Sequence, residues 1–104
     1  MTQNCIDLCI ACALACLKCE AACLQEKDVK NLTRCIELDK QCAAICYLAA
    51  DAIACKSEFG DEICRLCSEI CEACADECDK HPHEHCKDCA EACRKCAAEC
   101  HITH

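Results

Sequence analysis

The sequence predicts an all-α protein, an up-down-up-down antiparallel four-helix bundle with a core lined by cysteine, in a single domain over residues 1–104. Three observations predict this fold. Cysteine is 20 of the 104 residues, and in four segments it recurs mostly at gaps of 3 and 4, the period of a helix seam. The residues between the cysteines are mostly good helix formers such as Ala, Leu, Glu and Lys. Short turn-forming segments separate the four cysteine-containing segments from one another.

The composition requires that the thiols form the core. Leu, Ile, Val and Phe together supply only 18 residues, too few for an ordinary apolar interior. A neutral buried thiol behaves as a small hydrophobe. Cysteine can therefore fill the positions that Leu or Ile occupies in other bundles.

The first helix is predicted over the run CIDLCIACALACLKC and on to Cys23, followed by the turn QEKDVKN, in which Asp28 is a candidate N-cap for the second helix. In the second helix Leu38, Ala49 and Ile53 occupy seam positions that hold Cys elsewhere. The segment KSEFGDE, with the single Gly60, precedes the third helix, and DKHPHEH, with the single proline, precedes the fourth.

Nineteen cysteines follow the helical seams and are candidate metal ligands. At about 100° per residue, Cys55 points away from the other thiols of the second helix, or lies in the following turn. It is the weakest candidate. The nineteen are Cys5, Cys9, Cys12, Cys16, Cys19, Cys23, Cys35, Cys42, Cys46, Cys64, Cys67, Cys71, Cys74, Cys78, Cys86, Cys89, Cys93, Cys96 and Cys100.

Sulfur in this pattern favours Cu(I). Same-helix neighbours cannot all form disulfides without distorting the helices, and the ferredoxin-type iron–sulfur run is missing. Zinc with four thiolates leaves a charge of −2 per site, which is costly to bury repeatedly. Cu(I) bound by bridging thiolates replaces one proton per thiol and leaves the core neutral. This reasoning gives an upper capacity of about 20 Cu(I) ions per chain.

The histidines fall into two groups at opposite ends of the predicted bundle. His81, His83 and His85 lie in or beside the turn before the fourth helix, and His101 and His104 follow the last cysteine. They can be solvated turn and tail residues. The alternative is that one group is a metal port that passes Cu(I) to the first thiols.

The first helix carries a second stripe, formed by Ile10, Leu14, Leu17, Ala21 and Leu24. It is rotated by about 140° from the thiol stripe, so one core cannot cover both. A neighbouring helix could cover it in part. An exposed apolar stripe of this size is unusual on a monomer, and it favours a homo-oligomer that packs through the Ile10/Leu14/Leu17/Leu24 face.

The remaining composition excludes several classes of partner. The net charge is −8, the basic residues are dispersed, and aromatic residues are almost absent, so we expect no nucleic-acid partner. No uncharged run reaches a membrane span, and the N-terminal residues lack a signal-peptide pattern. We therefore expect a cytoplasmic protein with reduced thiols, and no enzyme, because no catalytic constellation is recognisable.

Together, CIDLCIACALACLKCEAAC, CAAICYLAADA, ICRLCSEICEACADECDKH and HCKDCAEACRKCAAEC resemble the bacterial four-helix-bundle copper storage proteins, in particular their cytosolic branch. The resemblance implies a bundle that folds without metal, binds many Cu(I) ions along its axis, assembles as a homo-oligomer (a tetramer) and has no enzymatic activity. A copper chaperone is a candidate partner. The alternatives are zinc or cadmium sequestration of the metallothionein kind and, less favoured, a thiol redox role.

Overall fold

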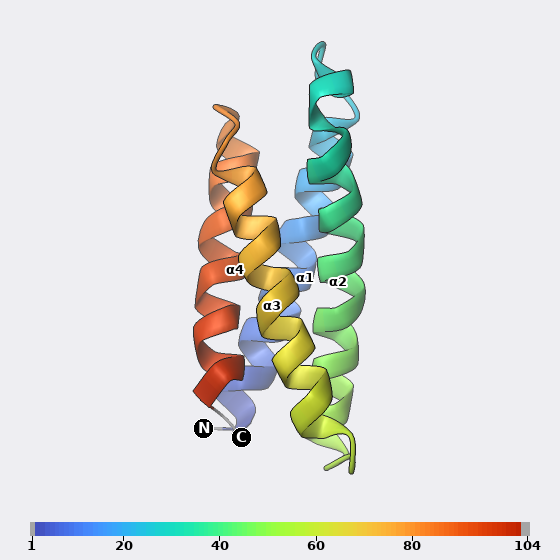
Figure 1. Ribbon diagram of the computed structural model, residues 1–104, viewed down its shortest axis with the longest axis vertical. Helices are drawn as coiled ribbons and strands as arrows, with labels where there is room; N and C mark the ends of the chain where they lie inside the picture. Colours follow the sequence, from blue (N-terminus) through green and yellow to red (C-terminus); the bar gives the residue numbers. More distant parts are fainter. Residues whose placement is uncertain (1, 103–104) are drawn as a thin grey trace.

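Four antiparallel helices form the part of the chain that the computed structural model describes, residues 2–102, with side chains described for residues 3–100 (Figure 1). The helices are α1 (Thr2–Cys23), α2 (Thr33–Ala54), α3 (Gly60–Cys78) and α4 (Glu84–Ile102), and the 3₁₀ helix η1 (Val29–Leu32) precedes α2. The bundle measures 43 × 17 × 17 Å. The predicted all-α, up-down-up-down architecture is confirmed. In the described part, no helix is both long and apolar enough to span a membrane.

The turn between α1 and α2 differs from the prediction. Asp28 precedes η1, not α2, and its side chain makes no capping hydrogen bond there. Its carboxylate instead lies 3.2 Å from Nε2 of His83. The predicted N-cap role of Asp28 is therefore wrong, because the carboxylate is engaged across the end of the bundle.

Cys55 lies at the C-terminal end of α2, outside the core. The helix ends at Ala54, and the next residues close it with backbone hydrogen bonds from Lys56 to Ile53 and from Ser57 to Ala52. Lys56 takes the left-handed conformation that this type of helix end requires, with φ 56°. The Cys55 side chain is exposed, as expected if it lies in the turn.

The core is made of thiols. The nineteen cysteines predicted to face inward are at most 2 % exposed, and small residues such as Ala13, Ala75 and Ala97 fill the gaps between helices. Because cysteine and alanine are small, four helices fit within a cross-section of 17 Å.

One carboxyl group, that of Asp39, lies inside this core and was not predicted. Asp39 is fully buried in α2, four residues after Cys35 and three before Cys42. Its neighbour Leu38, predicted to lie on the inward seam, is buried as well, at 8 % exposure, and belongs to the core. The thiols of Cys74 and Cys89 each donate to Asp39 Oδ1 at 3.3 Å. Burial, reinforced by the neighbouring thiols, raises the pKa of Asp39 from its ordinary value of 3.8 to about 11.

A neutral Asp39 makes the stability of the metal-free protein depend on pH. The unfolded chain releases the Asp39 proton near pH 4 and the folded chain retains it, so the contribution of Asp39 to the free energy of unfolding falls as pH rises from about 4 toward 11. Asp39→Asn removes this term. As pH rises, we expect the free energy of unfolding of the variant to increase relative to that of the wild type by as much as about 1.4 kcal/mol per pH unit. Denaturant unfolding of both proteins at pH 5, 6 and 7, under reductant, measures the difference.

The exposed Asp51 of the same helix supplies the control, because Asp51→Asn removes a carboxylate without changing the core. The wild type and Asp51→Asn should show the same pH dependence. A constant difference between Asp39→Asn and the wild type across this range would mean that Asp39 is ionised in the folded protein.

Candidate metal centre

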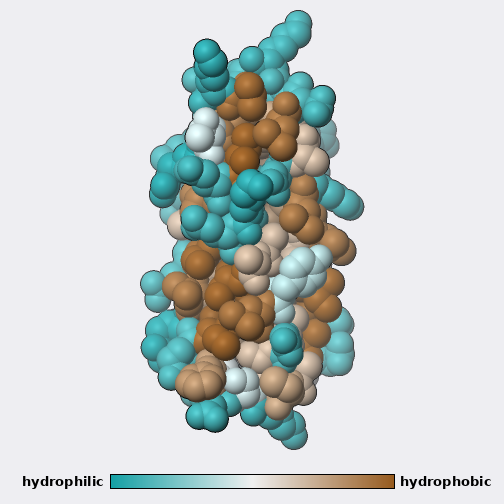
Figure 2. Space-filling view, turned by 90° about the vertical axis from the view of Figure 1, so that its right-hand side faces the viewer, coloured by the Kyte–Doolittle hydropathy of each residue, from teal (hydrophilic) through white to brown (hydrophobic). Residues whose placement is uncertain are grey.

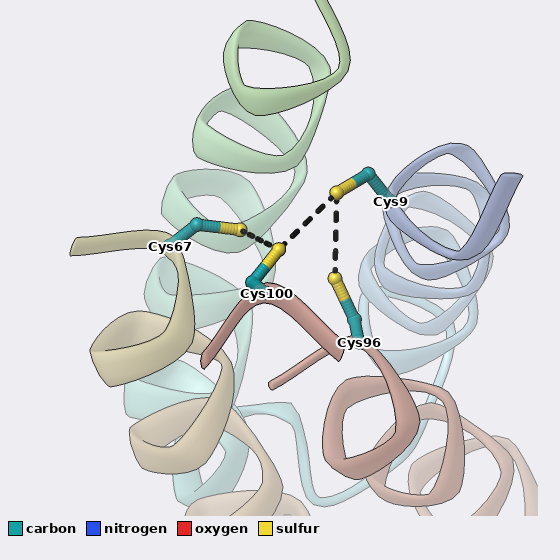
Figure 3. A group of neighbouring side chains, drawn as sticks. All are labelled: Cys9, Cys67, Cys96 and Cys100. Carbon is teal, nitrogen blue, oxygen red and sulfur yellow. Dashed lines mark hydrogen bonds between the residues drawn. The ribbon is translucent and has the colours of Figure 1, made fainter. Parts of the chain in front are cut away.

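The buried sulfur atoms lie at ligand distance from one another along the whole bundle. Cys9 of α1, Cys67 of α3 and Cys96 and Cys100 of α4 illustrate this (Figure 3). Cys100 Sγ is 3.5 Å from Cys9 and 4.0 Å from Cys67, and Cys96 is 3.7 Å from Cys9. A tetrahedral site with metal–sulfur distances of about 2.3 Å has sulfur–sulfur edges of about 3.8 Å. These four thiols can therefore hold a metal ion with little movement.

Further groups of four cysteines with similar spacing lie along the bundle, and some of these groups have cysteines in common. In each group of four, every sulfur lies within 4.8 Å of the others. Cys12 and Cys42 belong to two groups, and so do Cys16 and Cys93. Such shared sulfurs suit thiolates that bridge several ions better than they suit separate four-ligand sites. Beyond the group of Figure 3, the groups include Cys12/Cys42/Cys46/Cys71, Cys12/Cys16/Cys42/Cys93, Cys16/Cys74/Cys89/Cys93 and Cys19/Cys23/Cys35/Cys86.

The cysteines are free thiols. Their sulfur contacts of 3.5 to 4.0 Å are far longer than a disulfide bond of about 2.05 Å. Burial raises the pKa of Cys64 to about 11 and that of Cys86 to about 12. These thiols are therefore protonated at neutral pH when no metal is bound, and a metal ion must displace their protons.

Asp39 lies between two of the sulfur groups. Its Oδ2 is 3.9 Å from Cys35, and its Oδ1 is 3.3 Å from Cys74 and from Cys89. The spacing from Cys35 and Cys42 was the sequence signal that could have identified this position. Spacing alone does not predict its burial, because aspartate is rarely buried without a partner.

His81 and His83, in the turn before α4, and His85, in its first turn, differ in their surroundings, and only His85 contacts the thiols. His85 Nδ1 is 3.5 Å from Cys19 Sγ, 3.6 Å from Cys86 and 4.0 Å from Cys23. His81 instead contacts Glu77, and His83 contacts Asp28. The His101 side chain and His104 lie outside the described residues, so the second predicted histidine group is not placed.

His85 is also accessible from outside. A groove of about 420 Å³ between α1 and α4 is lined by Leu14, Lys18, His85 and Asp88, among others. The His85 side chain is 21 % exposed, whereas Cys19 and Cys86 are fully buried. His85 thus separates solvent from the sulfur groups at the end of the bundle where α1 ends and α4 begins (Figure 1).

Comparison with known proteins places these features in a family. The family model described as "Copper storage protein" matches residues 1–104. The chain is 49 % identical to the Cu(I)-bound copper storage protein BsCsp3, with a TM-score of 0.92, over 96 % of this chain and 94 % of that one.

Two further solved structures of copper storage proteins are similar to this chain. The apo form of copper storage protein 3 from Bacillus subtilis is 49 % identical, with a TM-score of 0.90, over 96 % of this chain and 95 % of that one. A cytosolic copper storage protein from Streptomyces lividans, containing five coppers, is 40 % identical, with a TM-score of 0.92, over 96 % of this chain and 88 % of that one. The resemblance predicted from the cysteine segments is confirmed: this chain belongs to the copper storage protein family.

Proposed function

We propose that this protein stores Cu(I) in the cytosol by binding many ions to the thiolates of its core. The observation that carries the proposal is the set of sulfur groups that share members along the bundle axis. A row of shared thiolates suits an ion with a low coordination number that accepts bridging sulfur. The Cu(I)-bound and cytosolic relatives support this assignment.

Charge explains why Cu(I) fits better than zinc or cadmium. Each Cu⁺ that replaces one thiol proton leaves the charge of the core unchanged. A divalent ion on four thiolates leaves a net charge of −2 in a site that is closed to solvent, and this costs free energy each time it is repeated. We therefore propose that all nineteen buried cysteines are ligands for Cu(I) and that the exposed Cys55 is not.

A catalytic thiol is the enzyme-class alternative, and one arrangement resembles it. Cys19 Sγ, His85 and Glu26 form a series with distances of 3.5 Å and 2.9 Å, like a nucleophile, a base and the group that orients it. Cys19 is 0 % exposed and belongs to a sulfur group, so a substrate cannot reach it. These contacts fit an ion-binding role, and we propose that the chain is not an enzyme.

We further propose that Cu(I) enters past His85, delivered in the cell by a copper chaperone. The lone pair of an imidazole nitrogen can hold Cu(I) while thiols exchange their protons. Among the described histidines, only His85 joins the outer groove to Cys19, Cys23 and Cys86.

We also propose that the chain forms a homo-oligomer, a tetramer as the family resemblance implies, through the apolar stripe of α1. Ile10, Leu14, Leu17 and Leu24 are 39 to 54 % exposed. Apolar side chains also gather into patches on the face that Figure 2 shows, with hydrophilic residues between them. Covering the stripe with the same stripe of a second copy would remove apolar surface that a monomer leaves in water.

Copper capacity tests the storage proposal. Anaerobic titration of the reduced, metal-free protein with Cu(I), against a competing chelator, should saturate near 19 ions per chain, one for each buried cysteine. Cys55→Ser should not change this number, and Cys71→Ser, at a fully buried position, should lower it. Saturation after a few ions, with zinc bound equally tightly, would refute copper storage.

The uptake route has a kinetic test. His85→Ala should slow the capture of the first Cu(I) equivalents by about 10-fold or more, because the thiols lose the exposed ligand that leads to them. The final capacity should stay the same. Stopped-flow transfer from a weak chelator measures the rate. His81→Ala is the control, because His81 contacts Glu77 and not the thiols; equal rates for the two variants would exclude His85 as the port.

The oligomer proposal predicts that Leu14→Glu produces monomers, since the introduced carboxylate would have to be buried without a partner. Light scattering coupled to size-exclusion chromatography measures the mass. Leu66→Glu on α3, also at a leucine about half exposed, is the control and should keep the wild-type mass. A wild type that is already a monomer would refute this interface.

A further inference from the structure

His85 is held by residues of two turns that are far apart in the sequence. Glu26 lies in the turn after α1, where its backbone N–H donates to Cys23 at 3.1 Å. Its Oε2 is 2.9 Å from Nε2 of His85. The other ring nitrogen of His85, Nδ1, faces the sulfur atoms of Cys19, Cys23 and Cys86. The imidazole ring therefore has a carboxylate on one side and thiols on the other.

The contact with Glu26 determines which nitrogen of a neutral His85 carries the proton. An ionised carboxylate can only accept a hydrogen bond, so at 2.9 Å the proton must be on Nε2. A neutral imidazole has a single N–H, and Nδ1 is then left with a free lone pair. That lone pair points toward the thiols, where a metal ion would bind. The opposite tautomer would present an N–H to the thiols and could not bind a metal there.

His83 and Asp28 support the same ring. The His83 ring lies parallel to the His85 ring, with 4° between the planes and 5.2 Å between the centroids. His83 Nε2 is 3.2 Å and 3.3 Å from the two carboxylate oxygens of Asp28, and its Nδ1 is 3.3 Å from Oε2 of Glu26. The orientation of His85 is thus fixed by a neighbouring ring as well as by Glu26.

We propose that Glu26 is a positioning residue for copper capture: by holding the proton of His85 on Nε2, it keeps the Nδ1 lone pair directed at Cys19, Cys23 and Cys86. This inference rests on the proposed uptake of Cu(I) past His85. It assigns a role to a carboxylate that contacts no thiol itself and that no cysteine spacing indicates. A carboxylate that accepts a hydrogen bond from a metal-binding histidine raises the basicity of the ligand and fixes its tautomer.

The tautomer can be measured without copper. Nitrogen-15 NMR of the reduced, metal-free protein distinguishes a protonated from an unprotonated ring nitrogen in His85. We expect Nε2–H in the wild type and a shift toward Nδ1–H in Glu26→Ala. Glu37→Ala, which removes an exposed carboxylate from α2, should behave as the wild type. An Nδ1–H tautomer in the wild type, or an unchanged tautomer in Glu26→Ala, would overturn the proposal.

Copper kinetics test whether Glu26 acts through His85. Glu26→Ala should slow the capture of the first Cu(I) equivalents by about 10- to 100-fold. It should add no further loss in a His85→Ala background. An equal loss in both backgrounds would mean that Glu26 acts by its negative charge and would overturn the positioning role.

The capacity of the same samples separates this proposal from copper storage. A wild type that saturates near one Cu(I) per buried cysteine, with an unchanged rate in Glu26→Ala, refutes the role of Glu26 alone. A wild type that saturates after a few ions refutes the proposed function itself. Circular dichroism of the metal-free variants checks that the helices are intact, which we expect because Glu26 lies in a turn.

Discussion

The structure depends on one constraint: the same sulfur atoms must pack the core and bind the Cu(I) ions. A helix places residues three and four apart on one face, so a cysteine at each of these positions gives a continuous line of sulfur. Four such lines meet at sulfur–sulfur distances of 3.5 to 4.0 Å. These distances are close to van der Waals contact and also close to the edges of a metal–thiolate site. The packed core is therefore a nearly preformed binding site, which agrees with the high similarity of the fold to both an apo and a Cu(I)-bound relative.

The core must also be electrically neutral, because its sulfur atoms are packed so closely. Thiolates packed this closely would repel one another strongly in a site closed to water. Burial raises the pKa of thiols such as Cys64 and Cys86 and so favours their neutral form when no metal is bound. The same principle accounts for Asp39, whose raised pKa keeps it neutral among the sulfur atoms. A cation that replaces one proton at a time keeps this neutrality, and a divalent ion on four thiolates does not.

The sequence predicted the periodic features of the molecule and missed the individual ones. Four helices, nineteen inward thiols and an outward Cys55 follow from spacing alone, because a helix converts spacing into direction. Asp39 shares that spacing, but spacing alone does not predict a buried carboxyl group, because its burial is unfavourable without partners that the sequence does not identify. The environment of His85 could not be predicted either. Glu26 reaches it across 59 positions of the sequence, and only the packing of the turns at one end brings them together.

The two ends of the bundle differ in a way that bears on how a long, closed core can be loaded. At one end, His85 joins a groove open to solvent to Cys19, Cys23 and Cys86. At the other, among the described residues, the turn after α2 carries Cys55 away from the core. Because the three groups in the middle of the bundle share Cys12, Cys42, Cys16 and Cys93, we infer that an ion can pass between these groups without leaving thiolate coordination. Each transfer returns a proton in the opposite direction, so protons can leave where copper enters. Under the proposed uptake past His85, a single opening would serve a bundle 43 Å long.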